Sequence, residues 1–176
     1  VGSKFIYFGY GSNMLTKRIR LLNPSAVRKG IGKLKDYELS FHTNSTRWNG
    51  APATIIPRVG KHTWGTIWEI DLSNMKDLDR QEGVAEGIYI PLSLPVETAN
   101  GDQITCRVYR LNKPTEPLVE GEEVAYDRQP SHTYLKTLIK GAIESGVPSD
   151  YVDFLRSFKH NGNVVQDMED HLEIND

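Results

Sequence analysis

Residues 5–14 read FIYFGYGSNM, an apolar run that stops abruptly at Gly11-Ser12-Asn13. This run, bounded by glycine, predicts a buried strand over Phe5–Tyr10. Apolar residues then recur at helical spacing until Pro24 stops the pattern. The stretch therefore predicts a strand that turns through Gly11 directly into a helix, which raises the question of whether the turn binds a ligand.

The bulk composition narrows the class of protein. The chain has 176 residues and a net charge of −2, which favours one domain with a hydrophobic core and gives no sign of a nucleic-acid-binding surface. Its single cysteine, Cys106, allows no internal disulfide, and the five histidines show no metal-ligand spacing. No apolar run reaches the roughly 18 residues of a membrane helix, and no signal-peptide pattern is present. We therefore expect a cytoplasmic protein without nucleic-acid or membrane partners.

The order of the expected elements predicts an α+β fold. Asn100-Gly101 separates two alternating segments and indicates a hairpin, and Ser131 caps the clearest helix. The acidic segment Lys113–Gln129 is expected to be a long loop. We expect one domain over residues 1–160, followed by an acidic, loosely ordered tail over 161–176. Further strands are expected at Tyr37–Phe41, Ala53–Ile56, Thr63–Ile70, Ile88–Leu94 and Ile104–Val108, and further helices at Leu72–Arg80 and Ser149–Phe158.

The turn after Tyr10 is the first candidate binding site. Gly11 lets the backbone approach a ligand closely, and Ser12 and Asn13 supply donors and caps. The N–H groups and the dipole at the start of the expected helix favour a carboxylate or phosphate. Many strand–helix turns have similar sequences and bind nothing, so the turn alone does not decide between an anion site and a structural turn.

Glu82 is the second candidate, because it ends the expected helix just before Gly83. The negative end of the helix dipole disfavours a charged carboxylate there, and burial would raise the pKa of Glu82 further. Such a carboxyl group can accept and donate a proton near neutral pH. Glu86 is the rival, although glycines flank it in an expected exposed turn. The alternative interpretation is that both glutamates are solvated residues at a helix end.

The two motifs together resemble the γ-glutamylcyclotransferase family. Tyr10–Met14 (YGSNM) and Glu82–Tyr89 (EGVAEGIY) carry the resemblance in this order, which covers the chain from Phe5 to Phe158. Further motifs that match are Leu22–Ser25, Trp64–Trp68, Ile104–Arg107, Gln129–Tyr134 and Gly141–Pro148.

The resemblance implies a single domain with a twisted, mixed, barrel-like sheet flanked by helices. It implies conversion of γ-glutamyl amino acids to 5-oxoproline and a free amino acid, with no metal and no organic cofactor. It also suggests a homodimer. Glu82 would be the catalytic general acid and base, whereas Gly9 departs from the family, in which alanine is usual. The substrate-binding residues that it implies are Tyr7, Phe8, Gly9, Tyr10, Gly11, Ser12, Asn13, Tyr89 and Tyr134.

The chemistry of that reaction suits these residues. The substrate's α-amine attacks its own γ-amide carbonyl, and intramolecular geometry supplies an effective molarity on the order of 10⁵ M or more. One carboxyl can move the proton from the ammonium to the leaving amine, which suits Glu82. By position alone, Tyr89 and Tyr134 are typical of tyrosines that only pack. Two alternatives stay open: a related enzyme that acts on γ-glutamyl amines or glutathione, and a non-catalytic binding protein on the same fold.

Overall fold

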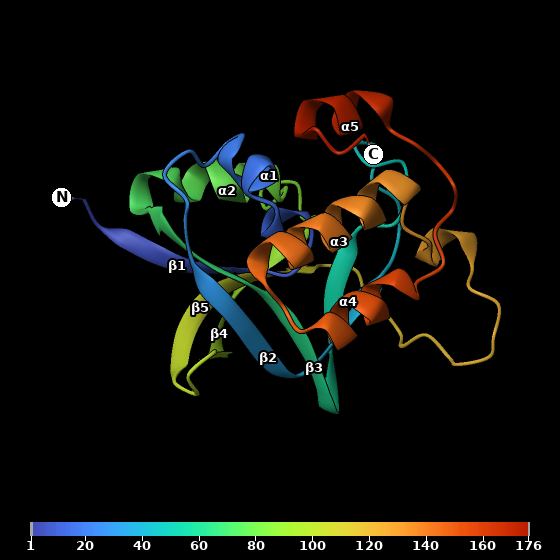
Figure 1. The fold of residues 1–176 in the computed structure, drawn as a ribbon, viewed down its shortest axis with the longest axis horizontal. Helices are drawn as coiled ribbons and strands as arrows, with labels where there is room; N and C mark the ends of the chain where they lie inside the picture. Colours follow the sequence, from blue (N-terminus) through green and yellow to red (C-terminus); the bar gives the residue numbers. More distant parts are fainter. Residues whose placement is uncertain (1, 176) are drawn as a thin grey trace.

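Five strands form a closed barrel in the computed structural model, which describes residues 2–175 (Figure 1). The order around the barrel is β1-β3-β2-β4-β5, and the neighbours in this order are antiparallel. A parallel contact between Tyr7 and Arg107 closes the barrel by joining β1 to β5. This mixed barrel confirms the expected α+β fold. The strands are β1 (Lys4–Gly9), β2 (Val27–Phe41), β3 (Ala53–Asp71), β4 (Tyr89–Thr98) and β5 (Gln103–Leu111).

The strands β2 and β3 are longer than the sequence indicated. β2 begins at Val27 and not at Tyr37, and β3 is one strand where two were expected. Residues 57–62, which join the two expected strands, are exposed, and of these Pro57 and His62 pair with β2 on either side of a register shift. Because this segment has no buried face, its apolar and polar residues do not alternate, so the continuity of β3 cannot be predicted from the sequence there.

Two local predictions are confirmed. The Asn100-Gly101 turn connects β4 to β5, with Gly101 in the left-handed region at φ 89°. Helix α3 (His132–Ser145) begins where Ser131 Oγ accepts a hydrogen bond of 3.0 Å from the backbone N–H of Tyr134. Both features depend on residues that are neighbours in the chain, so they can be predicted from the sequence alone.

The helices lie mainly on one side of the barrel. Figure 1 shows α1, α2, α3 and α5 along this side, with the β4–β5 hairpin opposite. None of the helices in residues 2–175 is long and apolar enough to cross a membrane. The other helical elements are η1 (Ser12–Met14), α1 (Thr16–Arg20), η2 (Leu72–Asn74), α2 (Met75–Gln81), η3 (Tyr126–Arg128), α4 (Ser149–Arg156) and α5 (Gln166–Leu172).

The C-terminal segment differs from the expected loose tail over 161–176. It contains α5, and Leu172 and Ile174 are buried in the main core cluster. Glu169 is buried as well, where it forms an ion pair of 2.7 Å with Lys136 of α3. The acidic composition suggested a loose tail, but two buried apolar residues and a buried ion pair hold this segment against the domain.

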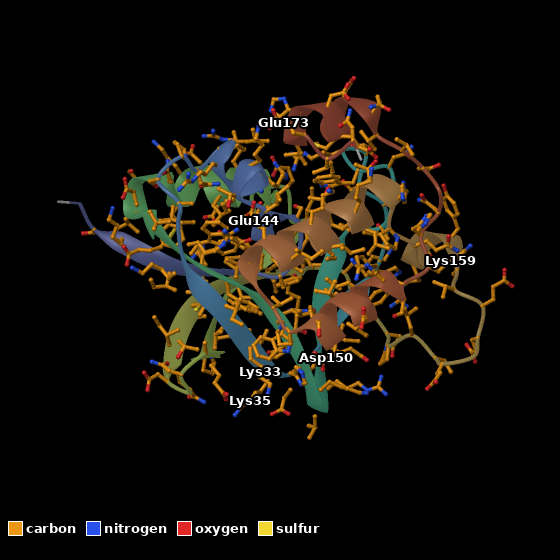
Figure 2. The ribbon with its side chains drawn as sticks, viewed as in Figure 1. Lys33, Lys35, Glu144, Asp150, Lys159 and Glu173 are labelled. Atoms are coloured by element: carbon orange, nitrogen blue, oxygen red, sulfur yellow. The ribbon has the colours of Figure 1, made fainter. Side chains whose placement is uncertain are left out.

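Glu144 of α3 fixes the start of α1. Its carboxylate accepts hydrogen bonds of 2.8 Å from the backbone N–H and 2.7 Å from the hydroxyl of Thr16. It also forms an ion pair with Arg28 of β2. Figure 2 shows Glu144 between α3 and the segment that carries α1. This contact ties the residues after the Gly11 turn to the longest helix.

Gly141 lets α3 pack directly on the backbone that follows this turn. A β-carbon at Gly141 would lie 2.7 Å from the backbone nitrogen of Leu15 and 2.8 Å from the carbonyl carbon of Met14. Because both are main-chain atoms, a side-chain rotation cannot relieve the contact.

We expect Gly141→Ala to destabilise the protein by about 1–3 kcal/mol, the usual cost of overpacking, although alanine is the better helix former. The free energy of unfolding in urea, followed by circular dichroism, measures this. Ile143→Ala, at an exposed position of the same helix, is the control and should change it by less than about 1 kcal/mol. A Gly141→Ala protein as stable as the wild type would contradict the close packing.

Candidate active site

The Gly11 turn and the end of α2 meet around a small cavity of about 40 Å³. Of the residues predicted for the site, all except Phe8 and Gly9 line it. Ala53 and Tyr109 also line it, although no pattern in the sequence indicated either residue. The full lining is Tyr7, Tyr10, Gly11, Ser12, Asn13, Ala53, Glu82, Tyr89, Tyr109 and Tyr134.

The geometry of β1 explains why Phe8 and Gly9 lie outside the lining. Successive side chains of a strand point to opposite faces, so Tyr7 faces the cavity and Phe8 packs, fully buried, in the main core. A β-carbon at Gly9 would lie 3.3 Å from the Tyr7 ring and 3.4 Å from Asn13. An alanine would therefore fit only with a small adjustment of these neighbours.

The turn differs from the expected direct entry into a helix. The three-residue turn η1 is followed by Leu15 in an extended conformation, and α1 then has only five residues. Neither Ser12 nor Asn13 makes a side-chain cap. So short a helix has little dipole, and the available donors are the N–H groups of the first turn, which have no partner inside it.

The Asn13 side chain connects the turn to Glu82. Its Nδ2 donates to the Tyr7 hydroxyl at 3.0 Å and to Glu82 Oε1 at 3.3 Å. Its Oδ1 accepts from Gln81 Nε2 at 3.0 Å, and its backbone carbonyl accepts from Trp68 Nε1 at 2.8 Å. These contacts fix the amide so that its NH₂ group faces the carboxylate.

Glu82 has the perturbed carboxyl that the sequence analysis anticipated. It follows α2 as the C-cap residue, and burial raises the pKa of Glu82 from 4.5 to about 7. The positive charges of Arg18 and Arg47 oppose this rise in pKa, and the charge of Asp79 adds to it. Near neutral pH such a group is present in both protonation states. Glu86, the rival, is exposed and does not line the small cavity.

Three of the cavity tyrosines use their hydroxyl protons within the fold, and one of them is Tyr109, whose hydroxyl donates to Asp79 Oδ1 at 2.5 Å. The Tyr10 hydroxyl donates to the backbone carbonyl of Tyr109, and the Tyr89 hydroxyl donates to that of Ala53, both at 2.5 Å. These hydroxyls position their rings and the neighbouring strands, and a ligand could use only their oxygen lone pairs.

Tyr7 and Tyr134 instead accept hydrogen bonds. The Tyr134 hydroxyl accepts from the backbone N–H of Ala53 at 3.0 Å, and that of Tyr7 accepts from Asn13. Burial raises the pKa of both hydroxyls above the ordinary value for tyrosine, so they stay protonated. Each therefore has a hydrogen that it can donate to a ligand in the cavity.

A larger groove of about 470 Å³ shares Glu82, Tyr89 and Tyr134 with the small cavity. Residues 43–48, in the connection between β2 and β3, form one of its walls. The acidic loop Lys113–Gln129 lines neither space. Glu82 thus stands where the small cavity and the groove meet.

Two residues that were not expected from the sequence also influence this site. Arg18 lowers the pKa of Glu82 by its charge, and Gln81 donates a hydrogen bond to Asn13. Arg18 is 5% exposed, and its guanidinium lies 5.5 Å from the centre of the Trp48 ring. A weak signal existed, because Arg18 follows Leu15 by three residues on the apolar face of the helix. Gln81 gave no signal beyond its place before Glu82. In residues 2–175 no three His, Cys, Asp or Glu side chains are placed to hold a metal ion.

Comparisons with known proteins identify the family. The AIG2-like family matches residues 62–155. The γ-glutamylcyclotransferase of Bos taurus is 40% identical over 176 residues, covering 96% of this chain and 88% of its own. The chain belongs to the γ-glutamylcyclotransferase family. The human member is 39% identical, covering 94% of this chain and 86% of its own. A solved γ-glutamyl cyclotransferase structure matches with a TM-score of 0.84 and 36% identity, over 97% of this chain and 99% of that one.

We expect Arg18→Met to raise the pKa of Glu82 above its value of about 7, because it removes the largest charge effect that lowers this pKa. A ¹³C NMR titration of the glutamate carboxyls measures it, with the Glu82 signal identified by its loss in Glu82→Gln. Lys17→Met removes a charge from the exposed face of the same helix and is the control that should leave this pKa unchanged. A wild-type pKa near 4.5, or no rise in Arg18→Met, would contradict the account.

Proposed function

We propose that this protein is a γ-glutamylcyclotransferase that converts γ-glutamyl amino acids to 5-oxoproline and a free amino acid, with Glu82 as general acid and base. One observation carries the assignment to Glu82: its half-buried carboxyl, with a pKa of about 7, shares a cavity with the Gly11 turn. The family membership, at 40% identity over most of the chain, supports the reaction.

The proposed reaction uses one carboxyl twice. The Glu82 carboxylate takes a proton from the substrate's α-ammonium, and the free amine attacks the γ-carbonyl carbon. The new N–C bond closes the five-membered ring. The bond from this carbon to the leaving nitrogen then breaks, while Glu82 returns its proton to that nitrogen. The ring nitrogen then gives up its second hydrogen as a proton, which the departing amine takes up to become an ammonium, so protons and electrons balance and no co-reactant is needed.

The other cavity residues hold the folded substrate. The N–H groups of Ser12 and Asn13 suit the α-carboxylate, and the free hydroxyl hydrogens of Tyr7 and Tyr134 suit the oxygen of the γ-carbonyl. Asn13 binds Oε1 of Glu82, which leaves Oε2 for proton transfer. Because ring closure is intramolecular, positioning supplies much of the rate enhancement.

Glu82→Gln tests the assignment. With γ-glutamyl-alanine as substrate, we expect 5-oxoproline formation to fall by at least about 100-fold, the usual contribution of a general acid–base group. The dissociation constant for the substrate, measured by calorimetry, should change little, because glutamine keeps the size and polarity of the side chain. Glu86→Gln is the matched control and should keep its activity.

Near-full activity of Glu82→Gln would remove Glu82 from the proposed role. If the wild type made no product, the γ-glutamyl amine and glutathione alternatives would be tested next. Failure of those substrates as well would favour a non-catalytic binding protein on the same fold.

We also propose a cytoplasmic location and a homodimer. The location is supported by the presence of a single cysteine, Cys106, which is 1% exposed in the core and forms no disulfide. The homodimer is supported by the family resemblance alone, and its measurement is the molar mass in solution.

A further inference from the structure

The proposed reaction fixes where the carboxylate of the leaving amino acid lies. To protonate the leaving nitrogen, a Glu82 oxygen must approach it to about 2.8 Å. The carboxyl carbon of an α-amino acid lies two bonds from that nitrogen, at about 2.5 Å. The leaving carboxylate therefore lies within about 5–6 Å of the Glu82 carboxyl. Only substrates whose leaving group is an amino acid bring this second negative charge.

The groove beyond Glu82 contains two arginines that could bind this carboxylate. Arg47 and Arg80 line this groove together with Glu82, whereas neither arginine lines the small cavity. The charge of Arg47 acts on the pKa of Glu82, so it is electrostatically close to the catalytic carboxyl. Glu86 is the other acid of the groove, and it is exposed.

Arg47 is the arginine that is free to bind an anion. Among residues 2–175 it has neither a hydrogen bond nor an ion pair, whereas Arg80 pairs with Asp77 of its own helix at 3.5 Å. Two carboxylates about 5 Å apart repel one another unless a cation lies beside them. The planar guanidinium of Arg47 matches a carboxylate in a bidentate geometry.

The loop holds the backbone of Arg47 in place. Ser45 pairs with Gly50, its carbonyl accepts a hydrogen bond of 2.7 Å from the N–H of Asn49, and its hydroxyl accepts one of 3.3 Å from the N–H of Trp48. Trp48 is buried, and its ring centre lies 4.9 Å from that of Tyr134. Arg47 is thus carried by a short anchored turn, which lowers the entropy lost on binding.

We propose that Arg47 binds the carboxylate of the leaving amino acid, so that the enzyme selects γ-glutamyl amino acids over γ-glutamyl amines. This inference rests on the proposed function, and it adds a specificity-determining residue to that reaction. Arg47 takes no part in the chemical step, so its effect should appear in KM more than in kcat.

Two substrates isolate the interaction. γ-Glutamyl-ethylamide is γ-glutamyl-alanine without the carboxylate of its leaving group. We expect the wild type to prefer the alanine substrate in kcat/KM, and Arg47→Gln to reduce this preference by about tenfold, as for the loss of one charge-assisted hydrogen bond. The loss of preference should come from a higher KM for γ-glutamyl-alanine, because any change in the pKa of Glu82 affects both substrates and cancels in their ratio. Arg47→Lys should keep part of the preference.

Arg58→Gln is the matched control. Arg58 is an exposed arginine of β3 that lines neither the cavity nor the groove and pairs with Glu38 at 3.2 Å. Its substitution removes the same charge and should leave the preference unchanged.

Four results would overturn the inference. Equal turnover of the two substrates by the wild type, or an unchanged preference in Arg47→Gln, would remove Arg47 from this role and leave the proposed function intact. A larger loss of preference in Arg80→Gln than in Arg47→Gln would assign the carboxylate to Arg80 instead. If the wild type cyclised neither substrate, the proposed function itself would fail, and the inference with it.

Discussion

The hydrogen bond from the Asn13 amide to the Glu82 carboxylate joins the two halves of the site. The same amide contacts Tyr7 of β1 and Gln81 of α2, so one side chain fixes the turn, the first strand and the end of a helix in one arrangement. The barrel brings these segments together by pairing β1 with β3, which leads into α2. Residues nearly seventy positions apart thereby share one small cavity.

Burial raises the pKa of Glu82 into the range that suits proton transfer, and it also makes the charged form of Glu82 unfavourable for folding. Its pKa is about 4.5 in the unfolded chain and about 7 in the folded one, so the folded state binds the proton more tightly between these values. The stabilisation from this group is complete below pH 4.5 and is lost as the pH rises through about 7. At Gly141, α3 packs closely on the backbone that follows the Gly11 turn. This packing helps to stabilise the fold against the unfavourable charge of Glu82.

The sequence predicted the features that local chemistry determines. The Asn100-Gly101 hairpin, the Ser131 cap and the position of Glu82 at a helix end follow from residues that are neighbours in the chain. The full lengths of β2 and β3 and the packing of 161–176 depend on distant contacts. The effect of Arg18 likewise depends on how α1 packs. Phe8 was assigned to the site as part of a contiguous motif, although successive side chains of a strand point to opposite faces.

The pH dependence of kcat/KM for γ-glutamyl-alanine shows whether the Glu82 carboxyl moves the proton. Between pH 5 and 7 the substrate's α-amine stays protonated, so a change in rate reports on the enzyme. We expect kcat/KM to fall about tenfold per pH unit below a midpoint near pH 7, which matches the pKa of Glu82. A flat profile through pH 7, or a midpoint near 4.5, would contradict it.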